Sequence, residues 1–160
     1  MSDQPRAVDW SRYDGSTRTL EAHLQRILRS EPWAGDDRRL ARVYMAIAKL
    51  LRSRMPGELI GYLDGLETLQ NDPANAVELN ALSSRLGSAA WQAQAAQPPG
   101  GEESDQSFLY RLMESCTKTK FTIDPETDVE PIGWAVALGV PYDDVRKAVL
   151  DEYSEISADV

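Results

Sequence analysis

Cys116 and His23 are the side chains of this sequence best suited to covalent or acid–base chemistry, and each is the single residue of its type. A cysteine acts as a nucleophile when a neighbouring base or positive charge lowers the pKa of its thiol. Leu112 and Met113 precede Cys116 by about one helical turn, and this apolar setting predicts a packed thiol. The sequence leaves open whether that thiol reacts. With one histidine and one cysteine, the sequence offers no histidine pair for a metal and no internal disulfide.

Acidic residues alternate over residues 124–130, which is the pattern of a calcium-binding loop. An EF-hand needs a glycine at the sixth loop position and a bidentate glutamate at the twelfth, where this sequence has Val129 and Ala135. Phosphate-binding loops of the GxxxxGK and GxGxxG types are also missing from the sequence. We therefore expect no metal site, no cofactor and no enzyme activity.

Charge is divided unevenly along the chain, whose net charge is −9. Residues 1–60 hold 11 basic and 8 acidic side chains, whereas residues 61–160 hold 6 and 18. A basic helix is predicted over residues 37–54, and its candidate partner-binding residues are Arg38, Arg42, Lys49 and Arg52. Such a helix could bind nucleic acid, an anionic membrane or an acidic groove. We favour pairing of its arginines with the acidic half of the same chain.

The elements that would position these residues are helices. Leu and Ala together number 35 against 15 for Val and Ile, a composition that favours helix over strand. Apolar residues recur at helical spacing in seven segments, which turn and capping signals separate. The segments are about 17–30, 37–54, 59–69, 73–97, 108–116, 132–138 and 143–156.

We predict an all-α fold in which a helical bundle is followed by a smaller helical segment. Residues 14–96 form the four-helix bundle-like region, and residues 106–157 form the smaller region with a helix-turn-helix-like hairpin at 131–153. Residues 97–105 between them contain prolines, glycines and acidic residues, which indicates a polar linker or loop. In the fourth predicted helix, Val77 and Trp91 are assigned to the inward apolar face. In the helix predicted over 37–54, Met45 is assigned to the polar side together with the basic residues.

The most specific local pattern is the hairpin sequence PIGWAVALGVPYDDVRKAVL at residues 131–150, with Ala135 at a tightly packed position and Gly139 in the turn. It resembles the helix-turn-helix of DNA-binding regulators, and this resemblance implies that the start of the second helix would read DNA. That start carries Tyr142, Asp143 and Asp144. Two carboxylates there would repel phosphates.

The same stretch is similar to the first two helices of a ubiquitin-associated domain, with Leu138-Gly139-Val140 at the place of that domain's Met-Gly-Phe loop. This similarity covers about half of such a domain, and the aromatic loop residue is missing. A hairpin used only for packing also explains the pattern, and we favour it over both resemblances.

We expect a small acidic helical protein of the cytoplasm that acts without catalysis, as a protein-binding adaptor or regulator. Besides the basic residues, the candidate contact residues are Trp134, Tyr142, Asp143 and Asp144. Nucleic-acid regulation through residues 131–150 is the alternative, which the negative net charge disfavours. The longest apolar stretch is too short to span a membrane. The sequence is also compatible with a homo-oligomer, and an exposed apolar patch would indicate such assembly.

Overall fold

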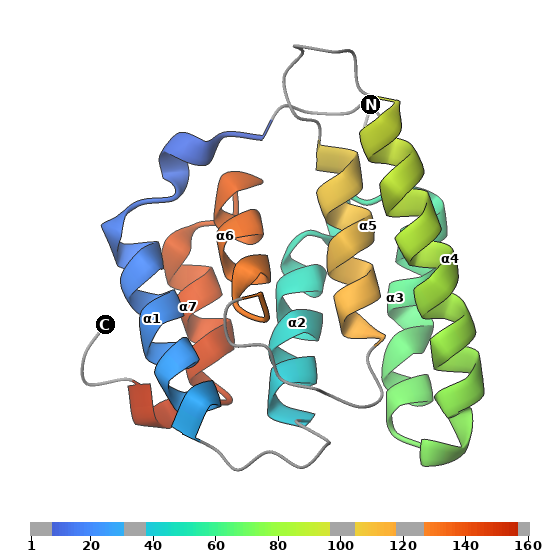
Figure 1. The fold of residues 1–160 in the computed structure, drawn as a ribbon, viewed down its shortest axis with the longest axis horizontal. Helices are drawn as coiled ribbons and strands as arrows, with labels where there is room; N and C mark the ends of the chain where they lie inside the picture. Colours follow the sequence, from blue (N-terminus) through green and yellow to red (C-terminus); the bar gives the residue numbers. More distant parts are fainter. Residues whose placement is uncertain (1–7, 31–37, 97–104, 118–126, 157–160) are drawn as a thin grey trace. The chain divides into compact units, whose positions relative to one another are not determined.

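The computed structural model describes residues 8–30, 38–96, 105–117 and 127–156. These ranges form α-helices joined by turns and short 3-10 helices and contain no strand, which confirms the prediction of an all-α fold. The α-helices (Figure 1) are α1 (Gly15–Ser30), α2 (Arg38–Leu50), α3 (Gly57–Gln70), α4 (Ala76–Ala95), α5 (Asp105–Cys116), α6 (Glu130–Ala137) and α7 (Tyr142–Leu150).

Local signals in the sequence set several helix ends. At the start of α1, the Asp14 carboxylate accepts hydrogen bonds from the backbone N–H groups of Ser16 and Thr17, at 3.0 and 3.2 Å. Between α6 and α7, Gly139 has φ 105°, the left-handed conformation expected for a glycine that ends a helix. Helix α2 ends at Leu50, earlier than predicted, and the chain continues as a 3-10 helix at Arg52–Arg54.

The helices group into two compact units by their contacts. One unit spans residues 51–119 together with 1–8 and holds α3, α4 and α5. The other spans residues 9–50 and 120–160 and holds α1, α2, α6 and α7. This grouping differs from the predicted regions 14–96 and 106–157. The predicted linker lies almost wholly outside the described residues and stays a prediction.

The unit with α1, α2, α6 and α7 is built from both ends of the sequence. Its α1, α6 and α7 lie side by side (Figure 1). The Tyr44 hydroxyl of α2 donates a buried hydrogen bond to the Asp128 carbonyl at 2.5 Å. The fully buried apolar side chains of this unit include Leu20, Leu24, Leu28, Leu40, Val43, Ile47, Val145, Val149 and Tyr153.

In the unit with α3, α4 and α5, α4 packs along α5 (Figure 1). Gly87 of α4 lies directly against the Glu114 carboxylate of α5, where a Cβ atom would collide with it. The buried apolar residues of the three helices include Leu59, Leu63, Leu66, Leu79, Leu82, Leu86, Leu109, Leu112 and Met113.

Three side-chain assignments from the sequence are wrong. Met45 was placed on the polar side of its helix, but it is buried. Val77 and Trp91 were placed on the inward face of α4, but their side chains are 80% and 71% exposed. The errors at Val77 and Trp91 come from rating residue type above helical angle, because the leucines that α4 buries already fix which side of the helix faces inward.

Candidate functional site

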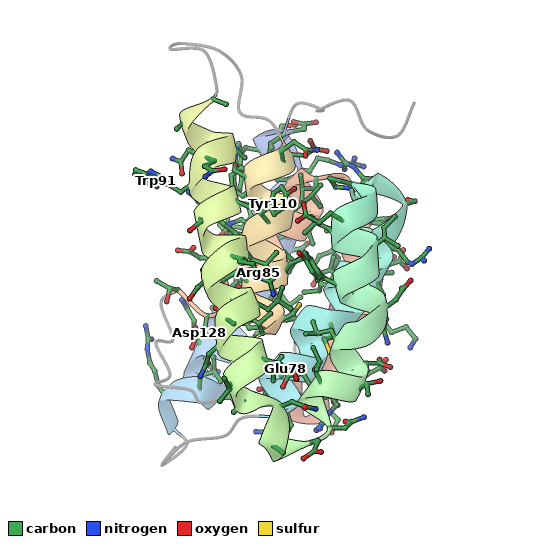
Figure 2. The ribbon with its side chains drawn as sticks, turned by 90° about the vertical axis from the view of Figure 1, so that its right-hand side faces the viewer. Glu78, Arg85, Trp91, Tyr110 and Asp128 are labelled. Carbon is green, nitrogen blue, oxygen red and sulfur yellow. The ribbon has the colours of Figure 1, made fainter. Side chains whose placement is uncertain are left out.

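The most unusual surface among the described residues lies on α4, opposite its buried side. Helix α4 buries Leu79, Leu82, Leu86 and Ala90. A second line of residues runs along the other side at intervals of four, three, four, three and four residues, and every member is exposed. We call this line the outer face of α4, and its members are Val77, Ala81, Ser84, Ser88, Trp91 and Ala95. Figure 2 shows Trp91 projecting away from α3 and α5.

The outer face carries no charged side chain, in a protein of which 27% of the residues are charged. The charged residues of α4 are Glu78 and Arg85, and both lie at one border of the outer face. The Arg85 guanidinium lies 6.0 Å from the centre of the Tyr62 ring of α3. At the opposite border, the Gln94 side chain accepts a hydrogen bond from Arg111 of α5. The charged side chains of α4 thus lie beside the outer face and not on it.

The exposure of Trp91 and Val77 leaves a large apolar area in water. Burying a tryptophan removes about 150–250 Å² of surface from water, so a covered Trp91 would be a substantial source of binding free energy. Trp is also enriched among the residues that dominate protein–protein binding. The small residues between Val77 and Trp91 would let a partner backbone come close to α4.

Two of the predicted basic residues, Arg42 and Arg52, form ion pairs within the chain. Arg42 of α2 pairs with Glu152. Arg52 pairs with Asp64 through two hydrogen bonds of 3.2 and 3.0 Å, and the bonds from Arg52 lower the pKa of Asp64. These contacts agree with the interpretation that arginines of the basic segment pair with the acidic half.

The four predicted basic residues do not form one helical face. Arg42 and the exposed Lys49 lie on α2, whereas Arg52 lies beyond its end and belongs to the unit with α3. The side chain of Arg38 lies outside the described part of the structure.

The predicted hairpin residues lie on α6 and α7. Trp134 is half-buried on α6, and Tyr142 is half-buried at the start of α7. Burial raises the pKa of the Tyr142 hydroxyl. Asp143 and Asp144 are exposed in the first turn of α7, where carboxylates are favourable next to the positive end of the helix dipole. Helix stabilisation accounts for these two carboxylates without a ligand.

Cys116 is completely buried at the end of α5, and burial raises the pKa of its thiol well above the ordinary value. The prediction of a packed thiol is confirmed. His23 lies on α1, in the other unit. The described residues contain no group of three histidine, cysteine or acidic side chains that could hold a metal ion. Of the calcium-loop-like segment, Asp124 and Glu126 lie outside the description, and Asp128 is buried.

One buried polar cluster was not foreseen from the sequence. The Tyr13 hydroxyl donates a hydrogen bond to the Glu21 carboxylate of α1. Burial raises the pKa of Glu21, and the neighbouring charge of Glu130 raises it further, while Tyr13 and Arg18 act in the opposite direction. Burial and the contact with Glu21 raise the pKa of Tyr13 to about 12. The cluster joins α1 to α6, where Gly133 leaves room for the Tyr13 ring.

Comparison with known proteins adds no relative: no family model, no curated protein and no solved structure matches this chain. Among the described residues, no helix is both long enough and apolar enough to cross a membrane.

Proposed function

We propose that this protein acts without catalysis, as an adaptor or regulator that binds another protein chain through the outer face of α4. The observation that carries the proposal is the exposure of Trp91 and Val77 on a line of a helix that has no charged member. Exposed large apolar side chains with charged and polar residues around them are typical of a protein-binding surface.

The alternative of a nucleic-acid regulator has less support. The exposed start of α7 presents Asp143 and Asp144, which would repel phosphates. Arg42 and Arg52, two arginines of the basic segment, already pair with carboxylates of the same chain. Nucleic-acid binding therefore stays a prediction from the sequence, as does partner binding by Trp134 and Tyr142.

The proposal is tested by retention of proteins from the native lysate on the immobilised full chain. Trp91→Ala should lose the proteins that the wild-type chain retains, because the largest apolar side chain of the outer face is removed. Leu50→Ala is the matched control, since Leu50 is another exposed large apolar residue, 42% exposed, and lies on α2. It should retain them. Equal retention by all three proteins would show that the outer face of α4 is not the binding surface.

A further inference from the structure

We infer that residues 9–13 form a latch on α1 and α6 that closes most firmly when Glu21 is protonated and loosens as Glu21 loses its proton. We call residues 9–13 the latch. It lies in the unit with α1, α2, α6 and α7, so its behaviour is independent of the function proposed for α4. A buried carboxylate that the closing segment itself covers is the observation that carries the inference.

The latch is attached to α6 at two places one helical turn apart. At the first, the backbone N–H of Asp9 donates a hydrogen bond of 2.9 Å to the carbonyl of Ala137, the last residue of α6. The carbonyls at the end of a helix need partners from outside the helix, and this bond supplies one. At the second, the Tyr13 ring lies directly against Gly133, where a Cβ atom would come within 2.9 Å of it. Gly133 and Ala137 therefore form the seat of the latch.

The latch buries little of its own surface. Its 3-10 helix, Trp10–Arg12, is exposed along its whole length, and Trp10 is 40% exposed. Tyr13 is half-buried. Segments with few buried apolar contacts open at a smaller free energy than the core of a protein. We therefore expect the latch to open while α1 and α6 remain folded.

Glu21 of α1 is the carboxylate that the closed latch holds out of water. Its side chain is buried and accepts a hydrogen bond from the Tyr13 hydroxyl. One of its carboxylate oxygens, Oε2, lies 3.8 Å from the position that a Cβ atom of residue 133 would take. Opening of the latch removes Tyr13 and returns the carboxylate to water. The pKa of Glu21 then returns towards its ordinary value of 4.5.

The described groups that act on Glu21 come from the latch, from α1 and from α6. In the closed latch, burial raises the pKa of Glu21, and the negative charge of Glu130 at the start of α6 raises it further. The hydrogen bond from Tyr13 and the positive charge of Arg18 lower it, but the net change is upward. The Arg18 guanidinium lies 5.2 Å from the centre of the Tyr13 ring. Burial raises the pKa of Tyr13 to about 12, so its hydroxyl stays a donor at acidic and neutral pH.

Helix α7 also packs against α1, and its first ionisable groups belong to a separate cluster. Burial raises the pKa of Tyr142 at the start of α7, and the charges that act on it are those of Arg146, Asp14 and Asp143. Glu21 is not among the charges acting on Tyr142. The pH response of the latch is therefore assigned to Glu21 and the groups around it.

The raised pKa of Glu21 sets the direction of the response. The closed latch binds the proton more tightly than the open latch, so low pH favours closure. As pH rises from 4.5 towards the closed-state pKa, Glu21 is already ionised in the open latch but still protonated in the closed one. The equilibrium constant for opening should rise in this range by at most about tenfold per pH unit, because one proton is involved. It should become constant above the closed-state pKa. The pH thereby controls how often the seat on α6 is uncovered.

Amide hydrogen exchange of Asp9 in the full chain measures the opening, because its N–H is bonded to α6 only while the latch is closed. After correction for the intrinsic effect of pH on exchange, its protection factor should fall between about pH 4 and pH 8 and then level off. The amide of Leu24, which is completely buried in α1, should stay more protected at every pH. Equal protection of the two amides would show that residues 9–13 open only with the whole unit, and this would overturn the inference.

Glu21→Gln has no proton to lose, so it should make the protection factor of Asp9 independent of pH. The matched control is Glu78→Gln, which changes the same type of side chain at an exposed position of α4, in the other unit. It should keep the wild-type dependence on pH. A dependence in Glu21→Gln equal to that of the wild type would exclude Glu21 as the controlling group.

Two further variants keep Glu21 and decide the question if Glu21→Gln does not fold. The quantity compared is the ratio of the Asp9 protection factor at low pH to that at neutral pH. Tyr13→Phe removes a hydrogen bond that favours the ionised carboxylate, so the ratio should increase by about fivefold. Glu130→Gln removes a charge that disfavours it, so the ratio should decrease by about twofold. Changes in the same direction, or no change in either variant, would contradict the latch.

Discussion

Glu21 and Tyr13 form a contact in which a carboxylate is partly removed from water and held by a phenol. The carboxylate is desolvated, and Glu130 adds a second negative charge nearby. Both effects favour the protonated form of Glu21. This single residue therefore makes the stability of the unit with α1 and α6 depend on pH.

Glu21→Gln should reduce that dependence on pH. The folded-state pKa of Glu21 is raised above the ordinary value of 4.5. A group of this kind contributes its full stability below the unfolded-state pKa, and the contribution is lost as pH rises through the folded-state pKa. The wild type should therefore lose stability relative to Glu21→Gln as pH rises from about 4 towards neutrality. Urea unfolding at several pH values measures this, and parallel curves for the two proteins would contradict it.

Gly133→Ala should destabilise the protein by about 1–3 kcal/mol, because the added methyl group overpacks the contact with Tyr13. A Cβ atom at position 133 would lie 2.9 Å from Cε2 of the Tyr13 ring. The matched control is Gly61→Ala on α3, where no atom lies within 4 Å of the added Cβ. That change should stabilise the protein by about 0.5–1 kcal/mol. Equal effects of the two substitutions in urea unfolding would show that Tyr13 does not pack closely on α6.

At the scale of the element, α5 begins at a buried ion pair. Arg54 and Asp105 approach to 3.2 Å, and their side chains are only 16% and 2% exposed. Nε of Arg54 is buried and has no hydrogen-bond partner within the described structure. Removal of either side chain would leave the charge of the other buried without an opposite charge beside it, which destabilises the folded state.

Asp105→Ala should therefore cost about 3–5 kcal/mol of unfolding free energy. Asp64→Ala removes the carboxylate of the exposed pair with Arg52 and should change stability little, because water and salt screen that pair. Chemical denaturation of both variants measures the contrast. A loss in Asp105→Ala no larger than that in Asp64→Ala would show that Arg54 finds other compensation.

Helix α4 differs from the other elements in that neither its inner nor its outer line carries charge. The inner line is made of leucines and alanine, and the outer line of small residues with Val77 and Trp91. The outer side of a helix that covers a core usually carries charged or polar residues, whereas Trp91 and Val77 are large apolar residues in that position. This feature is the reason why we propose that α4 binds a protein partner.

At the scale of the whole molecule, the two ends of the described chain contribute to one core. Helices α1 and α2 share a compact unit with α6 and α7, which follow after the segment that carries α3, α4 and α5. Loosening α1 should therefore expose residues far away in sequence. The predicted division into 14–96 and 106–157 leads to a different expectation, in which α6 and α7 would be unaffected.

Leu24→Ala should cost about 2–5 kcal/mol, because Leu24 is completely buried on α1. Amide hydrogen exchange should become faster in α6 and α7 as well as in α1 and α2. Measurement of exchange by residue in the wild type and the variant checks this outcome. Faster exchange confined to residues 14–96 would instead support the division predicted from the sequence.

Local patterns in the sequence were sufficient to predict the helices. The spacing of apolar residues in α2 and α4, Pro131 at the start of α6 and Gly139 after its end all act over a few residues, so they could be recognised without a structure. The packed state of Cys116 was predictable for the same reason, since its apolar neighbours lie on the same helix.

Which helices share a core, and which face of α4 is exposed, depends on contacts between residues that are distant in sequence. The pairing of Tyr44 with Asp128 and of Arg54 with Asp105 joins residues distant in sequence, and no local pattern encodes such pairs. Trp91 was assigned to the core because it is apolar. Leu79, Leu82 and Leu86 face α3 and α5, and they fix which side of α4 is buried. Trp91 lies on the other side of the helix and is therefore exposed.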